Sequence, residues 1–413
     1  MDSGRGDDDD GPVLTRPLLL VMALATGLTV GGNYVNQPLL HTIAGDLGVP
    51  DGRAAALVTV AQVAYGLGLL LVVPLGDLLE RRRLLTVLAL LAAAGHAVCA
   101  LAPNYAVLVV GTAVAGVFSV AAQVLVPFAA ELAEPGREGR AVGTVMSGLL
   151  IGALLARSVS GALAEVAGWH APYAVVAAGL VLIALVLRWR LPRSVPCSVG
   201  GYRATLRSGA RLVGELPRLR TRALLGGLGF AGVSVLFATT TFLLAGPRFG
   251  MSELQIGLVG LAGVAGAAMA SAAGRMADAG RGQLATGLGA VGLVFTWGLL
   301  GLSASTWLTS ALLFVLGFGL ADMFLQAVQV SNQNAVYGLR PEARSRLNSV
   351  YMTTYFAGGA LGSAVGSAAW SAGGWPAVTA VGAGFGVLTI LVWLVDLRLD
   401  RAARLSPAGA GSR

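Results

Sequence analysis

The sequence of 413 residues contains no lysine, so all 28 of its basic residues are Arg. Without lysine the chain has no Walker A motif and no lysine Schiff base, which argues against ATP-driven transport and against pyridoxal or retinal chemistry. Cysteine is nearly absent as well. Cys99 and Cys197 lie far apart in the chain and indicate no disulfide framework.

Charge is also scarce. Asp, Glu, Lys and Arg make up 12% of the residues, about half of the roughly 25% found in a soluble domain, whereas 56% of the residues are hydrophobic. A soluble protein of this length needs two or three cores with polar surfaces, and this chain has too few polar residues to cover them. The composition therefore predicts an integral membrane protein.

Apolar runs of about 20 residues, the length that a helix needs to cross a bilayer, recur along the whole chain. The connections between them are mostly short and leave no room for a soluble domain. We predict an all-α membrane protein with twelve transmembrane helices, over residues 17–40, 54–75, 84–102, 105–130, 141–165, 171–189, 222–245, 253–273, 284–303, 306–334, 347–370 and 376–397.

The distribution of Arg predicts the orientation of these helices. If both termini are cytoplasmic, Arg53 and Arg248 lie outside, Arg157 lies within a span, and the other 25 Arg lie inside. We therefore expect cytoplasmic termini in the cell inner membrane. The pI of about 10.2 then indicates contact with anionic lipids and no nucleic-acid binding.

The two halves of the predicted bundle repeat one another. Gly168–Trp169 matches Gly374–Trp375 at an offset of 206 residues, and the same offset joins Gly152 to Gly358. Chance similarity between helices rich in Gly and Ala would explain a single Gly pair but not the Trp pair. We expect a disordered acidic tail (1–16), a six-helix bundle (17–189), a basic cytoplasmic loop (190–221), a second six-helix bundle (222–397) and a cytoplasmic tail (398–413).

Two loops carry an Asp followed by Arg. Asp77 precedes Arg81 and Arg82 after the second predicted span, and Asp278 precedes Arg281 at the corresponding place in the second half. The first loop resembles the signature of the major facilitator superfamily. The resemblance implies two six-helix bundles that alternate access to a central site, with these five residues at the cytoplasmic gate.

Other segments resemble one branch of that superfamily. Asn33–Leu40 and Arg340–Asn348 are similar to bacterial efflux permeases for drugs or metabolites, and Ser147–Gly161 is similar to the glycine-rich motif of the superfamily's proton antiporters. The resemblance implies a monomer without a cofactor, in which spans 1, 4, 7 and 10 line the cavity.

A carboxylate lies near the middle of the tenth predicted span. An ionised Asp322 there costs about 2.5–3.5 kcal/mol, so it needs a partner, water or a proton. Gln326, Gln329 and Gln333 follow it on the same helical face, which predicts the wall of a water-filled cavity or, alternatively, a polar seam between helices. Asp322 is our candidate for the coupling proton, with a permanently paired structural Asp as the alternative.

Arg157 lies in the fifth predicted span, among small residues and about two turns from the helix end. A side chain at that depth is poorly placed to reach the membrane surface by snorkelling, which is the alternative explanation. We expect Arg157 to pair with Asp322 or to bind an anionic group of the substrate.

Further amides and hydroxyls occur in several spans, and they suit a neutral polar or amphipathic ligand with apolar walls around it. Hydrogen bonding between helices is the alternative role for each of them. His96, near Cys99 in span 3, fits a structural hydrogen-bonded His better than a proton carrier, and no cluster has metal-ligand spacing. The candidate cavity residues besides the Gln stripe are Thr26, Asn33, Gln37, Gln62, Tyr65, Ser119, Gln123, Ser234, Thr241, Tyr351 and Tyr355.

These observations favour a secondary transporter that exports a small organic compound in exchange for protons. A facilitator or importer with a structural Asp322–Arg157 pair is the second possibility, and a membrane sensor is a remote third. An integral-membrane enzyme would need a nucleophile–base set or a metal cluster, and the sequence offers neither.

Overall fold

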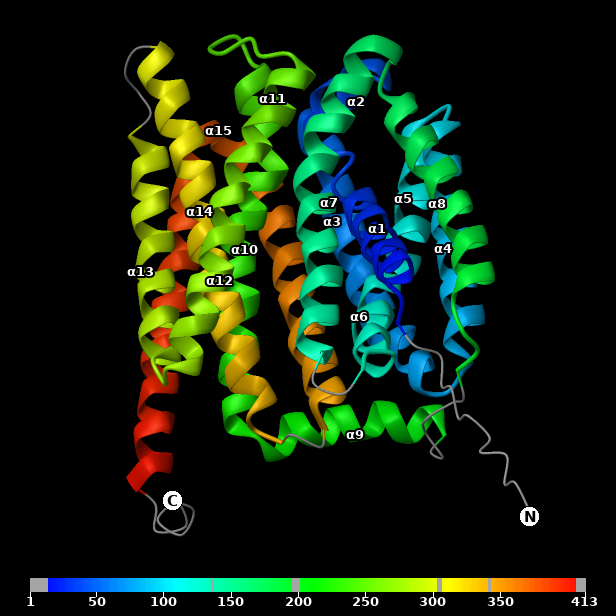
Figure 1. Cartoon of the computed structure of the whole chain (residues 1–413). Helices are drawn as coiled ribbons and strands as arrows, with labels where there is room; N and C mark the ends of the chain where they lie inside the picture. The colour runs from blue at the N-terminus through cyan, green and yellow to red at the C-terminus, as the bar shows by residue number, and fades with distance from the viewer. Residues whose placement is uncertain (1–13, 135–136, 195–200, 303–306, 341–342, 406–413) are drawn as a thin grey trace, which may run out of the picture.

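The computed structural model describes residues 14–134, 137–194, 201–302, 307–340 and 343–405. Within these ranges the regular secondary structure is entirely helical, with no strand, and the long helices stand side by side in one bundle (Figure 1). This confirms the prediction of an all-α protein for the described part of the chain.

The first half of the bundle is built from eight α-helices and two 3-10 helices. Several of the sequence's apolar runs are divided into two helical pieces. The helices are α1 (Arg16–Gly32), η1 (Gln37–Leu39), α2 (Leu40–Asp46), α3 (Asp51–Leu71), η2 (Val73–Asp77), α4 (Arg81–Ala100), α5 (Tyr105–Phe118), α6 (Ala121–Glu131), α7 (Glu138–Ala167) and α8 (His170–Arg190).

The second half follows the connecting helix α9 (Tyr202–Glu215). Its helices are α10 (Pro217–Ala245), α11 (Glu253–Val259), η3 (Gly260–Gly263), α12 (Val264–Asp278), α13 (Gly282–Gly301), α14 (Trp307–Tyr337) and α15 (Arg344–Leu405).

Eleven helical segments of the described chain are long and apolar enough to cross a membrane. The last segment, α15, consists of two helices joined at Gly373 and Gly374, where the backbone is not helical. Gly374 has a φ of 59°, a left-handed conformation that glycine adopts without a steric penalty.

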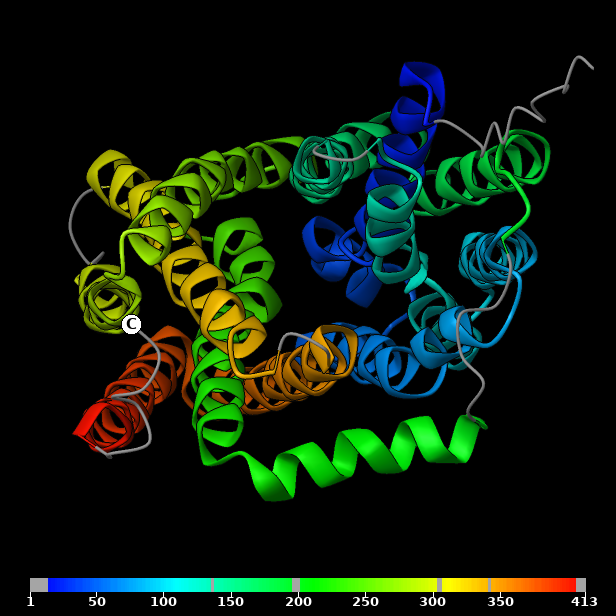
Figure 2. The same cartoon turned by 60° about the horizontal axis from the view of Figure 1, so that its bottom comes forward.

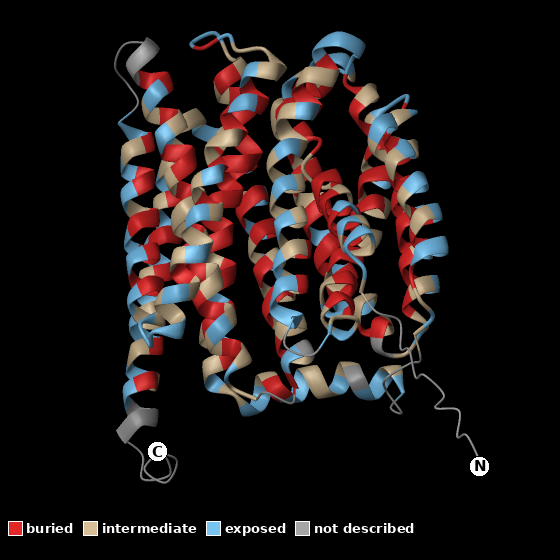
Figure 3. Ribbon diagram, in the orientation of Figure 1, coloured by how far each residue is buried: buried red, intermediate tan, exposed pale blue. Residues whose placement is uncertain are grey.

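Burial differs strongly between the helices and reflects their place in the bundle. In Figure 3, α10 is coloured as buried along most of its length, whereas α7 shows mainly intermediate and exposed residues. Large apolar side chains such as Leu24, Val166 and Leu182 are exposed on the outside. An apolar exterior of this kind matches the hydrocarbon of a bilayer.

Equivalent glycine contacts hold the first and fifth spans of each half together. In the first half a Cβ on Gly152 of α7 would strike the backbone of Gly27 in α1. In the second half a Cβ on Gly358 of α15 would strike the backbone of Gly227 in α10. Because Gly152 and Gly358 are also related by the 206-residue offset, the repeat in the sequence corresponds to a repeated close packing of two backbones.

Several spans of the described chain are broken within the bundle. The first is interrupted between Gly32 and Gln37, the fourth between Phe118 and Ala121, and the eighth at η3. Breaks free backbone groups from helical hydrogen bonds, and at membrane depth they are tolerated only inside protein or beside a cavity.

Helix α9 lies across one end of the bundle and bridges the two groups of helices (Figures 1 and 2). The sequence predicts only a basic loop over 190–221, whereas the structure places this amphipathic helix in it. Its first residue, Tyr202, donates a hydrogen bond to the Leu71 carbonyl of α3 at 2.7 Å. Near its other end Leu212 is buried in the core of the second half.

The two halves meet along two pairs of spans. Helix α3 packs against α15, where the hydroxyls of Thr59 and Ser363 lie 2.8 Å apart, and α7 packs against α11 and η3. Ser158 of α7 donates to the Gly257 carbonyl at 3.0 Å. Beyond η3 the eighth span turns to α14 instead of α7, so this second contact is confined to the half of the bundle remote from α9.

Candidate functional site

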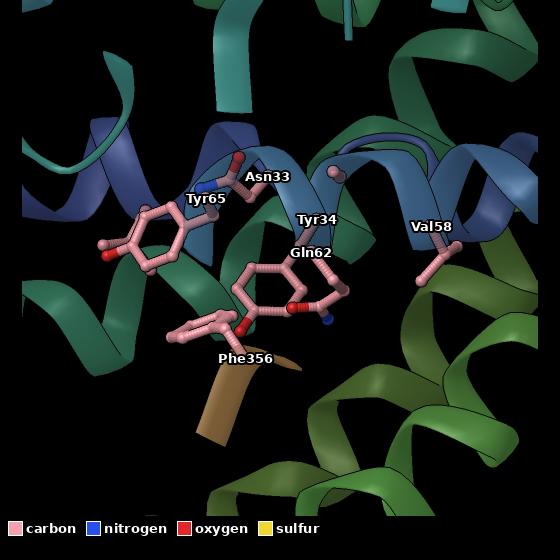
Figure 4. A pocket seen from close by; sticks show the side chains of 8 residues that line it. Asn33, Tyr34, Val58, Gln62, Tyr65 and Phe356 are labelled. Carbon is pink, nitrogen blue, oxygen red and sulfur yellow. The ribbon is translucent and has the colours of Figure 1, made fainter. Parts of the chain in front are cut away.

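A small pocket lies between the end of α1, helix α3 and helix α15. Figure 4 shows the side chains of Asn33, Gln62 and Tyr65 around it, together with Tyr34 and Phe356. The break in the first span positions Asn33 and Tyr34, because the chain leaves α1 at Gly32. The pocket thus brings together three predicted cavity residues, Asn33, Gln62 and Tyr65, in an environment of amides and aromatic rings.

Arg157 is enclosed by residues of both halves. Its guanidinium carbon lies 4.8 Å from the ring centre of Tyr34 and 4.4 Å from that of Phe237. Its Nε donates a hydrogen bond to Gln37 Oε1 at 2.7 Å. A guanidinium stacked between two rings and fixed by an amide is held inside the bundle, so the snorkelling alternative does not describe this side chain.

Asp322 projects from α14 toward the broken eighth span. Its carboxylate lies against Gly263 and Gly266, where any Cβ would crowd it. The side chain is only partly buried, and no hydrogen bond or ion pair within 4.0 Å links it to another residue of the described chain. Arg157 is close enough for the two charges to interact but not to touch. Asp322 and Arg157 therefore interact through their charges, but they form no ion pair with each other.

The glutamine stripe that follows Asp322 divides into two parts. Gln326 lies beside Gly266 near the carboxylate. Gln329 instead accepts a hydrogen bond from the Tyr355 hydroxyl at 3.2 Å, and Gln333 donates to Asn348 at 3.4 Å. Gln326 thus lies beside the Asp322 carboxylate, whereas Gln329 and Gln333 form a polar seam with α15.

The two predicted tyrosines of α15 belong to this seam. Tyr351 is fully buried and donates to the Gln329 carbonyl at 3.5 Å. Tyr355 stacks on Phe230, with ring centres 4.2 Å apart. Both residues therefore join α15 to α14 and α10.

Other predicted cavity residues lie outside the pocket of Figure 4. Thr26 is fully buried and donates to the Met22 carbonyl of its own helix at 2.8 Å. Thr241 donates to the Gln37 carbonyl across the half interface. The hydroxyls of Ser119 and Ser234 are buried without a hydrogen-bond partner in the described chain.

Gln123 is the remaining predicted residue of the fourth span. It lies within hydrogen-bonding reach of the Tyr65 hydroxyl, so it supports a residue of the pocket.

The first predicted gate loop forms a compact charged contact. Arg81 is buried, donates through Nε to the Gly76 carbonyl at 3.1 Å and forms an ion pair with Glu131 at the end of α6. Arg82 lies 3.5 Å from Glu80. The side chain of Asp77 lies outside the described part of the structure.

The corresponding loop of the second half lacks such contacts. Asp278 ends α12 and Arg281 precedes α13, and both side chains are exposed. No ion pair within 4.0 Å joins either of them to another described residue.

A buried charged cluster in the second half was missed by the sequence analysis. Arg222 of α10 and Asp396 of α15 form an ion pair at 2.7 Å, and their side chains are 2% and 0% exposed. Gln283 donates to the same carboxylate at 2.7 Å. The carboxylate of Asp396 is therefore fully buried, whereas that of Asp322 is only partly buried. The i, i+4 pairs Arg218/Arg222 and Asp396/Asp400 were the signal that could have revealed it.

Comparison with known proteins gives the family. The Major Facilitator Superfamily model matches residues 22–336. The uncharacterized transporter YgaY of Escherichia coli O157:H7 is 44% identical over 393 residues, which cover 94% of this chain and 98% of that protein. The probable transporter SCO4007 of Streptomyces coelicolor is 33% identical over 397 residues, 95% of this chain and 89% of that protein.

Solved structures agree at the level of the fold. A bacterial homolog of the human lysosomal transporter Spinster, in an inward-facing and occupied conformation, matches with a TM-score of 0.74 and 15% identity over 95% of this chain and 98% of its own. The human organic anion transporter MFSD10 matches with a TM-score of 0.65 and 20% identity over 92% of this chain and 99% of its own. This family consists of transporters and not of enzymes. The chain belongs to the Major Facilitator Superfamily and is a multi-pass membrane transporter.

Proposed function

We propose that this transporter is a proton-coupled exporter of a small organic compound that works by alternating access. The observation that carries the proposal is the state of Asp322, a carboxylate inside the bundle without a hydrogen-bond partner in the described chain. An ionised carboxylate at that depth costs about 2.5–3.5 kcal/mol, and a bound proton removes that cost.

Arg157 supports a coupling role because it remains charged under all working conditions. We infer that its positive charge stabilises the Asp322 carboxylate electrostatically after the proton has left. The proton would then be bound and released between α7, the eighth span and α14.

The pocket of Figure 4 suits the predicted substrate class. Asn33 and Gln62 offer amide donors and acceptors, while Tyr65 and Phe356 provide aromatic surface. Such a lining favours a neutral polar or amphipathic compound.

The driving force is sufficient for concentrative export. Inward movement of one proton yields about 2.3 kcal/mol per 100 mV and about 1.36 kcal/mol per pH unit. Together these sustain a substrate gradient of several hundred-fold, since about 1.4 kcal/mol corresponds to a factor of ten.

We also propose that α15 counts as two spans divided at Gly373 and Gly374, which gives twelve spans in a 6+6 arrangement with cytoplasmic termini. The predicted halves 17–189 and 222–397 then act as the two moving bundles of a monomer in the cell inner membrane, in contact with anionic lipids. The bias of Arg toward one side of the membrane supports this orientation.

The orientation is testable with a C-terminal reporter. A fused fluorescent protein should fold and fluoresce, and a fused periplasmic phosphatase should be inactive. An active phosphatase would place the C-terminus outside and reject the proposed topology.

The coupling role is testable in vesicles with Asp322→Asn. Asn keeps the shape of the side chain but cannot exchange a proton, so we expect loss of proton-driven accumulation while substrate exchange or binding persists. Glu134→Gln, at an exposed position with no proposed transport role, is the matched control and should transport normally. Full proton-driven accumulation by the Asp322→Asn variant would refute the role of this residue.

One observation favours a second candidate. Because the charges of Arg157 and Asp322 interact, they can also serve as a structural pair in a facilitator or importer. In that case flux through the native protein would be unchanged when the proton gradient is collapsed with an ionophore.

A further inference from the structure

A second polar cavity, with room for about one water molecule, lies within the first half of the bundle. Helices α4, α5 and α8 and the break after α1 surround it. His96 and Cys99 of α4 line one wall, Tyr173 of α8 another, and Asn36 belongs to the break. None of the proposed transport residues except Asn33 borders this cavity.

Three polar side chains around this cavity are buried without a hydrogen-bond partner in the described chain. His96, Asn36 and Tyr173 are 2%, 4% and 3% exposed. Neither ring nitrogen of His96, nor Asn36 Oδ1, nor the Tyr173 hydroxyl has a hydrogen-bond partner among the described residues. Buried polar groups in proteins are almost always hydrogen-bonded to protein or to ordered water, so four orphaned atoms around one cavity point to a bound molecule.

The lining identifies the chemistry of that molecule. A neutral imidazole supplies one donor and one acceptor, the tyrosine hydroxyl supplies either, and the amide oxygen supplies an acceptor. No charged side chain borders the cavity, and Cys99 with its neighbour Thr112 adds only weak polar groups. A small neutral molecule that both donates and accepts hydrogen bonds fits this set, and water is the simplest such molecule.

The cavity adjoins the proposed substrate pocket. Asn33 and Ala61 border both spaces, so these two residues form the partition between them. His96 packs directly against the end of α1, since a Cβ on Gly32 would lie 2.6 Å from His96 Nε2. Water entering past Asn33 therefore reaches the point at which the first span is broken.

We propose that this cavity is a water-binding site, filled from the central pocket past Asn33, and that its water completes the hydrogen bonds of His96, Asn36 and Tyr173. The backbone at the break is paired by turn hydrogen bonds, such as that from Tyr34 N–H to the Gly31 carbonyl at 2.9 Å, so the water serves the three side chains packed around it. It thereby stabilises an irregular segment at a depth where lipid offers no partner. The site does not depend on the identity or direction of the transported compound.

Radiolytic footprinting of the full chain in nanodiscs tests the hydration directly. Brief X-ray irradiation splits bound water into hydroxyl radicals, which oxidise adjacent side chains that mass spectrometry then locates. Cys99 and Met22 form a matched pair, because both carry sulfur and both are 0% exposed, but only Cys99 lines the cavity. We expect early oxidation of Cys99 with Met22 spared. Equal protection of the two would show a dry cavity and overturn the proposal.

The melting temperature of His96→Leu should change in opposite directions for a wet and a dry cavity, and His96→Gln serves as the comparison. If water is bound, His96→Leu breaks its hydrogen bonds and lowers the melting temperature, whereas His96→Gln retains a donor and an acceptor and stays close to the native value. If the cavity is dry, His96→Leu removes an unpaired polar group and raises the melting temperature, which would contradict the proposal. Footprinting uses the unmodified chain and decides the question even where a variant does not fold.

Discussion

At the scale of single residues, the site depends on how closely the backbone of the eighth span approaches the side chain of Asp322. Gly266 leaves space for this carboxylate, since a Cβ at that position would lie 2.8 Å from Asp322 Cγ and 3.1 Å from Gln326 Cγ. Arg157 is held from two sides by rings and from a third by Gln37. The position of the acid relative to the cation is therefore set by packing and not by a direct bond.

Gly266→Ala should disturb transport while preserving the fold. The added methyl group pushes the Asp322 carboxylate out of its place, and we expect transport to fall about ten-fold or more, because small displacements of reacting groups are costly. Initial transport rates in vesicles measure the effect.

The matched control is Gly298→Ala, in a helix where a Cβ meets no atom within 4 Å. This control should transport normally and be as stable as the native protein, or up to about 1 kcal/mol more stable. Equal activity of the two variants would show that Asp322 does not need this position.

At the scale of helices, buried charge joins the first and last spans of the second half. Arg222 donates through Nη1 to Asn332 at 2.9 Å and to Thr286 at 3.1 Å in addition to its ion pair with Asp396. Such a pair adds little stability compared with well-packed apolar residues. Removal of Arg222, however, leaves the buried Asp396 with only the more distant Arg218, at 3.9 Å, as a cation.

Arg222→Met should therefore lower the free energy of unfolding by about 3–5 kcal/mol. The double variant Arg222→Met/Asp396→Leu should recover most of that loss, because no lone charge remains buried. Thermal unfolding in one detergent compares the three proteins.

An exposed ion pair of the first half is the control for this comparison. Arg83 lies 2.8 Å from Glu80 with its side chain 75% exposed. Arg83→Met should cost only about 0–1 kcal/mol. If the double variant is no more stable than Arg222→Met alone, the buried charge of Asp396 does not explain the loss of stability.

At the scale of the whole molecule, α9 connects the two halves on one face of the bundle. Its last residue, Glu215, contacts Arg340 at 2.9 Å and Arg211 at 2.5 Å. The hydrogen bond from Arg211 lowers the pKa of the Glu215 carboxyl, with smaller contributions from the charge of Arg340. Because this pKa is lower in the folded state, the contact persists above the ordinary Glu value and is lost only as the pH falls below it.

Glu215→Gln should loosen this end of α9 at neutral pH. We expect amide hydrogen exchange over residues 202–216 to become roughly a few-fold faster, a modest effect because the ion pair is exposed. In the native chain the same change should occur only as the pH falls below the ordinary pKa of Glu, because the pKa of Glu215 is lowered in the folded state.

The control is Glu134→Gln, which removes a comparable exposed pair with Arg137 far from α9. This variant should leave the exchange of residues 202–216 unchanged. Faster exchange in the control alone would show that Glu215 does not fasten α9.

Some features of the site follow from the position of a residue along its helix, whereas others depend on contacts between helices. Position along a helix predicted that Asp322 and Arg157 lie inside the membrane, and the structure places both inside the bundle. The Gln stripe was harder to interpret, since its two ends face different surroundings although the spacing is the same throughout. The Arg222–Asp396 pair was missed because its members lie 174 residues apart and each lies near the end of a span.

The sequence by itself determined the helical spans, because a long apolar segment in lipid can satisfy its backbone only within its own helix. It also determined the repeat, since the same close backbone approach requires glycine at Gly152 and Gly358. Only the tertiary structure decided where the spans break, how α9 lies and which polar groups meet. Those features depend on contacts between residues far apart in the chain, such as Arg157 with Gln37, and no local pattern encodes them.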